Sequence, residues 1–147
     1  MAAKDIFHGQ FVRALEKDGW TITDDPLTFR VMNTDLLIDI GAERLLGAER
    51  DSQRIAVEIK SFVGKSAVQD LKEAAGQFLL YEEALKRSPG NVDRILLLAV
   101  RLPIYISLFE NGIGKILLES QRLQLVIFDA ATEEIKQWIP PTVTQTL

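Results

Sequence analysis

The chain has 147 residues, 47% of them hydrophobic, which fits one domain with a buried core. It contains no cysteine, so disulfides and thiolate-bound metals are excluded, and a hard ion with oxygen ligands, Mg²⁺ or Mn²⁺, is the expected metal. The net charge of −4 argues against a protein that coats nucleic acid, because such proteins neutralise many phosphates with Lys and Arg, but it is compatible with a nuclease whose site is locally basic.

The sequence carries no sign of a membrane segment. Its first residues lack the apolar stretch of a signal peptide, and no apolar run approaches the roughly 20 residues that cross a bilayer. We therefore expect a cytoplasmic protein with no membrane partner.

The first half of the chain predicts one helix followed by several strands. Apolar residues at helical spacing predict a helix over 5–18, and Gly19 is suited to end it. Extended segments separated by turn residues are expected over 20–23, 28–32, 36–40, 45–49 and 54–62. The last two are expected to form a hairpin that turns at 51–53.

The second half predicts a long helix and a central strand. Ser66 is a suitable N-cap for a helix over 67–87. One buried side is expected from its apolar positions, Val68, Leu71, Ala75, Phe78, Leu79, Ala84 and Leu85. The uninterrupted apolar run 95–100 predicts a strand covered on both faces. Further short helices are expected over 103–109 and 113–120, and further strands over 124–128 and 134–139. This order predicts an α/β fold with a mixed central sheet flanked by helices.

A carboxylate and an ammonium lie within the apolar strand expected around 55–60. Because successive strand side chains alternate, Glu58 and Lys60 share one face, and Val57 and Ile59 occupy the other. Desolvating two charges is costly, and a strand built only for stability would carry Val or Ile at these positions. The pair indicates metal-assisted phosphodiester cleavage, in which Glu58 holds a divalent cation and Lys60 steadies the attacking water or the charge that develops on the phosphate.

A second carboxylate is needed to complete such a site. Asp39 is the first choice because it too lies between apolar residues, and Asp35 is the second. Two carboxylates, a backbone carbonyl and waters form a chemically sensible Mg²⁺ site. The competing interpretation is that Glu58 and Lys60 form a structural ion pair on an edge strand and that Asp39 caps a turn.

These residues resemble the PD-(D/E)xK nuclease superfamily, whose restriction-endonuclease-like fold has an αβββαβ core. In that resemblance Asp39 matches the first acid, although no proline precedes it, and Glu58 and Lys60 match the second half of the motif. The resemblance implies Asp39, Glu58 and Lys60 as catalytic residues, with Asp39 and Glu58 as metal ligands.

Two further segments resemble parts of this superfamily. Gln77-Phe78-Leu79-Leu80-Tyr81 resembles the Q-x-x-x-Y helix motif of the RecB-like branch, in which Gln77 would position water or a phosphate oxygen. Four residues apart on a helix, Gln77 and Tyr81 share a face, which makes Tyr81 an accessory residue. Gly19-Trp20 resembles a pair that follows the first helix of resolvase-like members, where His8 takes the place of a Glu as a second accessory residue.

Most of the chain, from about 5 to 138, is similar to the cyanobacterial XisH family. The similar segments are Asp5-Ile6-Phe7-His8, Asp18-Gly19-Trp20-Thr21-Ile22-Thr23, Ile38-Asp39-Ile40-Gly41-Ala42-Glu43, Ile55-Ala56-Val57-Glu58-Ile59-Lys60-Ser61-Phe62 and Gly76-Gln77-Phe78. The family is named for controlling excision of the fdxN DNA element during heterocyst differentiation, together with companion Xis proteins.

This resemblance implies one restriction-endonuclease-like domain over 1–147 with a role in programmed DNA rearrangement. Its expected partners are DNA, an XisI-like companion and a second copy of the chain, because cutting both strands usually takes two sites. The alternative is a non-catalytic regulatory subunit that acts by binding the companion protein.

Overall fold

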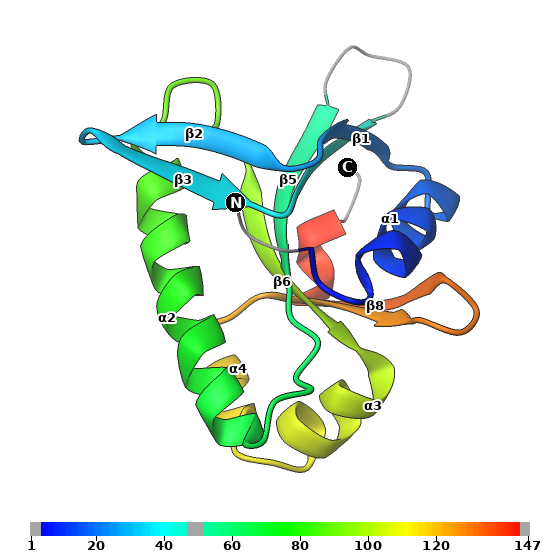
Figure 1. The fold of residues 1–147 in the computed structure, drawn as a ribbon. Coiled ribbons are helices and arrows are strands. Elements are labelled where there is room, and N and C mark those ends of the chain that lie inside the picture. The colour runs from blue at the N-terminus through cyan, green and yellow to red at the C-terminus, as the bar shows by residue number, and fades with distance from the viewer. Residues whose placement is uncertain (1–3, 47–51, 145–147) are drawn as a thin grey trace.

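The computed structural model describes residues 4–46 and 52–144 and is built around a six-stranded sheet (Figure 1). In spatial order the strands are β1 (Thr21–Asp24), β4 (Ile40–Leu45), β5 (Ser52–Ile59), β6 (Ile95–Arg101), β7 (Leu125–Asp129) and β8 (Glu134–Ile139). The pairs β5–β6 and β6–β7 are parallel and the other pairs are antiparallel. The predicted mixed sheet is therefore confirmed.

A separate two-stranded ribbon projects from this sheet. Strands β2 (Leu27–Val31) and β3 (Thr34–Ile38) pair antiparallel through a two-residue turn. Met32 and Asn33 in this turn have φ of 50° and 65°, the left-handed backbone that tight hairpins require. In Figure 1 the ribbon lies beside the C-terminal half of the long helix.

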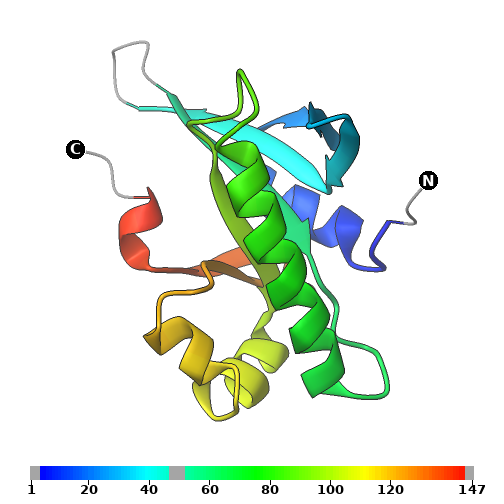
Figure 2. The ribbon, with the colours of Figure 1, turned by 90° about the vertical axis from the view of Figure 1, so that its left-hand side faces the viewer.

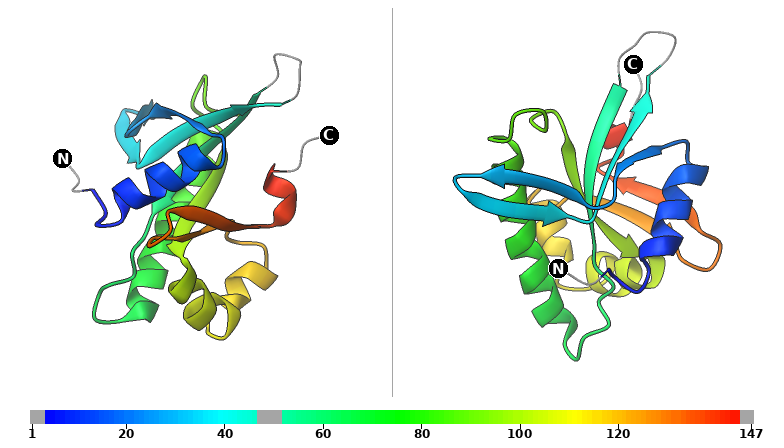
Figure 3. Two further views of the ribbon diagram at one scale, coloured as in Figure 1. Left: turned by 90° about the vertical axis from the view of Figure 1, so that its right-hand side faces the viewer. Right: turned by 45° about the horizontal axis from the view of Figure 1, so that its top comes forward.

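The helices lie on both faces of the central sheet (Figures 2 and 3). They are α1 (His8–Lys17), α2 (Ala67–Leu85), α3 (Leu102–Ile104), the π-helical turn η1 (Tyr105–Glu110), α4 (Lys115–Glu119) and the 3₁₀ helix η2 (Pro141–Thr144). Helix α1 packs on one face, and α2 and η1 pack on the other. Within the described residues, no helix is long and apolar enough to span a bilayer.

Strand alternation divides the core into two layers. Ala56, Leu96 and Leu98 pack in the layer under α2, whereas Ile55 and Val57 pack in the layer under α1. Because β6 lies in the middle of the sheet, its side chains are buried on both faces, as the apolar run predicted. Glu58 belongs to the same alternation as Ala56 and so lies on the α2 face of the sheet.

Helix α2 begins as predicted, with the Ser66 hydroxyl accepting a hydrogen bond of 3.2 Å from the Gln69 backbone N–H. It ends at Leu85, two residues earlier than expected. The prediction that Val68 and Leu79 are buried is wrong, because Leu79 is 56% exposed and Val68 is also exposed. Helical periodicity turns both side chains away from the side that packs on the sheet.

Two predicted strand boundaries also differ. The extended segment 36–40 is broken at Asp39, where the chain leaves the ribbon and enters the central sheet. The hairpin predicted over 45–62 is a pairing of β4 with β5 that begins at Ile40, so Ser52 and Gln53 lie in a strand rather than in a turn. Residues 47–51 of that prediction lie outside the described residues.

Helix α1 begins at His8 rather than at position 5, because an Asp5 carboxylate oxygen accepts a hydrogen bond from the Phe7 N–H in a turn.

Candidate functional site

Asp39 lies at the bend between β3 and β4 and contacts the end of β5. Its Oδ2 accepts a hydrogen bond of 2.8 Å from the Ile59 backbone N–H. Ile59 directly follows Glu58, so this hydrogen bond brings the Asp39 carboxylate against the Glu58 side chain. Two acids that are far apart in the sequence therefore form one pair at the junction of the ribbon and the central sheet.

The Glu58 carboxyl of this acidic pair is strongly perturbed by its surroundings. Burial, followed by a hydrogen bond and charge repulsion from the Asp39 carboxylate, raises the pKa of Glu58 to about 9. The positive charge of Lys60 opposes this change but does not cancel it. In the absence of a cation the Glu58 carboxyl is therefore protonated at neutral pH and can donate a hydrogen bond to Asp39.

Helix α2 contributes Tyr81 to the surroundings of this pair. Tyr81 is partly buried, and burial together with the charges of Glu58 and Asp39 raises the pKa of its hydroxyl. Gln77 lies one helical turn earlier, on the same row of the helix, and is exposed. The structure thus brings Tyr81 within the electrostatic range of the acids, while the contribution predicted for Gln77 stays a prediction.

Lys60 follows β5 directly and is held at its backbone and at its side chain. Its N–H donates to the Ala99 carbonyl at 3.1 Å, which continues the pairing of β5 with β6. Its Nζ forms an ion pair of 3.3 Å with Oε2 of Glu73 on α2. The sequence analysis did not identify Glu73 as a residue of the site.

Glu73 completes a row of polar residues on α2. Glu73, Gln77 and Tyr81 are spaced by four residues and rise by about 6 Å per step. Glu58 and Lys60 are separated by a similar distance of about 6.6 Å along their strand. The row and the end of the strand face each other, because Lys60 pairs with Glu73 and the charge of Glu58 acts on Tyr81. The spacing of four residues from Gln77 is the sequence signal by which Glu73 could have been found.

Two other candidates have different partners. Asp35 is 81% exposed on the ribbon, where it forms an ion pair of 2.6 Å with Arg30. His8 is buried at the start of α1, and its Nε2 lies 2.8 Å from the Asp25 carboxylate in the turn between β1 and β2. Because α1 covers the face of the sheet opposite to α2, His8 ties α1 to this turn instead of joining the acidic pair.

The donor set of the pair fits a hard divalent cation. Asp39 and Glu58 lie close enough for each carboxyl group to act on the other, and carboxylate oxygens are the ligands that Mg²⁺ prefers. Across residues 4–46 and 52–144, no group of three or more His, Cys, Asp or Glu side chains converges. An ion bound at Asp39 and Glu58 would take its remaining ligands from backbone carbonyl oxygen and water, which is common for Mg²⁺.

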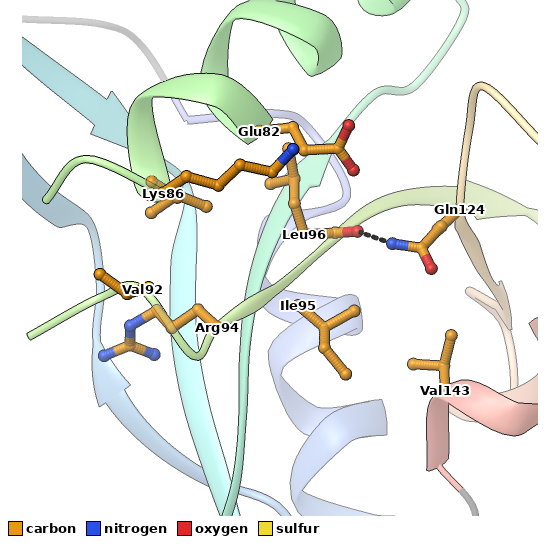
Figure 4. A pocket seen from close by; sticks show the side chains of 9 residues that line it. Glu82, Lys86, Val92, Arg94, Ile95, Leu96, Gln124 and Val143 are labelled. Atoms are coloured by element: carbon orange, nitrogen blue, oxygen red, sulfur yellow. Dashed lines mark hydrogen bonds between the residues drawn. The ribbon is translucent and has the colours of Figure 1, made fainter.

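A hollow of about 360 Å³ lies elsewhere, between the C-terminal part of α2 and the start of β6 (Figure 4). None of the acidic pair, Lys60 or Tyr81 lines it. Its buried cation, Arg94, already donates to the Asn91 side chain, the Ile55 carbonyl and the Asp24 carboxylate. Gln124 lines the hollow and donates to the Leu96 carbonyl at 3.2 Å. Arg94 and Gln124 are therefore engaged in holding strands together.

Comparison with known proteins decides the family. The sequence model of the XisH family, described as XisH protein, matches residues 1–136. The chain belongs to the XisH family. A comparison with curated proteins finds no significant sequence match.

Two crystal structures are similar to this XisH chain over nearly their whole length. An XisH family protein from Nostoc punctiforme is 40% identical, with a TM-score of 0.79, and the match covers 91% of this chain and 98% of that one. An fdxN element excision controlling factor protein from Anabaena variabilis is also 40% identical, with a TM-score of 0.79, over 92% of this chain and 99% of that one. The family resemblance seen in the sequence segments is confirmed.

Proposed function

We propose that this XisH protein is a metal-dependent DNA endonuclease of the PD-(D/E)xK superfamily that acts in the excision of a DNA element. The observation that carries the proposal is the partly buried carboxyl pair of Asp39 and Glu58, with Lys60 two residues further on the same face. The order of α1, the strands up to β5, α2 and β6 agrees with a restriction-endonuclease-like core. The name of the similar Anabaena protein supports the process of element excision.

The raised pKa of Glu58 explains why the acidic pair suits a cation better than a structural role. Ionising both carboxyl groups places two negative charges side by side in a partly buried position. A divalent cation removes this repulsion, and it would supply charge neutralisation at the phosphate and a water activated for attack. Asp39 is held in place for this role by the N–H of Ile59.

Lys60 and the α2 row act on the attacking water and the phosphate. The Lys60 ammonium, released from Glu73, orients the water or stabilises the charge that develops on the phosphate. Gln77 positions the same water or a phosphate oxygen from the row that it shares with Glu73 and Tyr81. The DNA backbone approaches the start of α2, where Lys65 is exposed.

Cleavage of labelled DNA tests this proposal. The purified protein is mixed with labelled duplex and branched DNA in the presence of Mn²⁺. We expect strand cleavage that falls at least about a hundredfold in Lys60→Ala, the scale for loss of a group that stabilises the transition state. Lys136→Ala is the matched control, since it removes an exposed, ion-paired lysine on β8, at the far edge of the sheet from the site, and keeps cleavage. Equal background with the wild type and Lys60→Ala would count against nuclease activity.

The second candidate function is a non-catalytic subunit that binds an XisI-like companion. The net charge of −4 and the ion pair that holds Lys60 against Glu73 favour it. Isothermal titration with Mn²⁺ separates the two functions. A nuclease gives a binding heat that is lost in Asp39→Asn, whereas a subunit that has abandoned metal chemistry gives no site-specific heat. Both functions require access to the excision machinery on DNA, so we place the protein in the cytoplasm in either case.

A further inference from the structure

Gly76 lies in the middle of α2 on its fully exposed side. It is opposite the side of the helix that packs on the sheet through Leu71, Ala74 and Phe78. A Cβ added at Gly76 meets no atom within 4 Å, and the backbone there is ordinary helix. Glycine is less favourable than alanine in a helix interior, so nothing within the described chain accounts for a glycine at this position. The space beside Gly76 that a side chain would fill is therefore open to an atom of another molecule.

Apolar side chains border this gap. Leu79 and Leu80 lie one turn further along α2, on either side of Gly76, and are 56% and 58% exposed. Leu80 also lines an apolar hollow together with Met32, which is 88% exposed at the tip of the β2–β3 ribbon. Val68 extends the surface toward the start of the helix. We call this surface, formed by Val68, Gly76, Leu79, Leu80 and Met32, the outer α2 surface.

We propose that the outer α2 surface binds the same surface of a second copy of this chain, with the two α2 helices packed antiparallel about a two-fold axis. An axis beside the peptide between positions 77 and 78 places Leu79 of each copy over Gly76 of the other. Small residues allow helices to approach closely, and a Leu side chain fills the space that the absent Cβ leaves. The two-fold repeats this contact, as isologous interfaces do.

Two charged residues of α2, Lys72 and Glu83, border the outer α2 surface and favour a second copy of the chain as its occupant. The same axis places Lys72 of each copy opposite Glu83 of the other, so the contact occurs two times in the dimer. Among the described residues, Lys72 has no ion-pair partner, and the exposed Glu83 pairs only with Lys86 and Arg87, which directly follow α2. One surface thus carries both halves of a complementary pair, which a two-fold contact requires. The exposed leucines argue against a nucleic-acid phosphate as the occupant.

The size of the outer α2 surface sets the expected strength. A standard interface takes about 800 Å² from each partner. The outer α2 surface has four exposed apolar side chains and is therefore small for an interface. We expect a weak dimer that dissociates on dilution. The inference does not depend on nuclease activity, because it concerns only the assembly of the chain.

Sedimentation velocity of the full chain over a concentration series tests the proposal. The wild type is expected to pass from monomer to dimer as concentration rises. Gly76→Ala is the decisive variant, because its two effects have opposite signs. The added methyl group raises Tm through better helix propensity, yet it weakens the dimer by about tenfold or more because it occupies the space of the incoming Leu79. Loss of folding cannot produce this combination.

Charge exchange tests the direction of packing. Lys72→Glu and Glu83→Lys each place like charges together and weaken the dimer, whereas the double variant restores it. Ile116→Glu on α4 is the matched control, because it adds a charge at another exposed apolar residue and leaves the dimer unchanged. Tm measured for each variant confirms that it is folded. A wild type that stays monomeric at every concentration would overturn the proposal and leave the surface to a different protein. A dimer that Gly76→Ala does not weaken, or single charge variants that the double variant does not rescue, would overturn it equally.

Discussion

Replacing Glu58 by glutamine is expected to stabilise the cation-free protein at neutral pH. Burial and the neighbouring Asp39 raise the pKa of Glu58 from 4.5 to about 9 in the folded state. Between these values the unfolded chain has lost a proton that the folded protein keeps, so the free energy of unfolding falls as pH rises. The side chain introduced by E58Q does not ionise in either state, and its amide can still donate a hydrogen bond to Asp39.

The size of the effect follows from the distance between the pH and the unfolded pKa. Each pH unit above 4.5 removes about 1.4 kcal/mol of stability from the wild type until the pH reaches the folded pKa. At pH 7 the wild type has therefore lost about 3 kcal/mol relative to E58Q. For a chain of this size that corresponds to a Tm difference of the order of 10 °C. Near pH 4.5 and below, the difference is expected to vanish.

Thermal unfolding in the presence of a chelator, followed by circular dichroism from about pH 4.5 to 8.5, measures this difference. Glu73→Gln is the matched control, because it removes an exposed carboxylate near the same site, and its effect should stay within about 0.5 kcal/mol at every pH. A Tm difference for E58Q that does not change with pH, or a loss of stability at pH 8, would refute the reasoning that Glu58 is held protonated against Asp39.

Three further predictions concern the surroundings of the site. Mn²⁺ should raise the Tm of the wild type, but this rise should be lost in Asp39→Asn, as a Mn²⁺ titration by differential scanning fluorimetry will show. Ser66→Ala removes the N-cap of α2 and should cost about 1 kcal/mol in urea unfolding, whereas an unchanged midpoint would mean that the cap contributes nothing. Arg94→Met leaves the Asp24 and Ile55 acceptors without their donor and should cost about 3 kcal/mol by the same assay, with a loss below about 1 kcal/mol contradicting a structural Arg94.

Local patterns in the sequence were sufficient for the elements that depend on neighbouring residues. The alternation around Glu58 predicted its strand and face, the hydroxyl of Ser66 predicted the start of α2, and the run through Leu97 predicted a strand buried on both sides. These features arise from periodicity and capping, which a short window of sequence contains. The family resemblance rested on longer segments and is confirmed.

Features that depend on packing between distant segments were not predictable in the same way. The break at Asp39 is hidden within a largely apolar segment, because it is caused by the passage of the chain from one sheet to another. The pairing of Lys60 with Glu73 requires knowledge of where α2 lies against β5. Leu79 was assigned to the core because apolar residues surround α2 more widely than the sheet can cover.

A crystal structure of the protein soaked in Mn²⁺ tests the proposed cation site most directly. Anomalous density is expected at one position, within about 2.6 Å of carboxylate oxygens from both Asp39 and Glu58. The hydrogen bond between the two carboxyl groups should then be replaced by coordination. Absence of density at this position under millimolar Mn²⁺, with the two carboxyl groups still hydrogen-bonded to each other, would contradict the account.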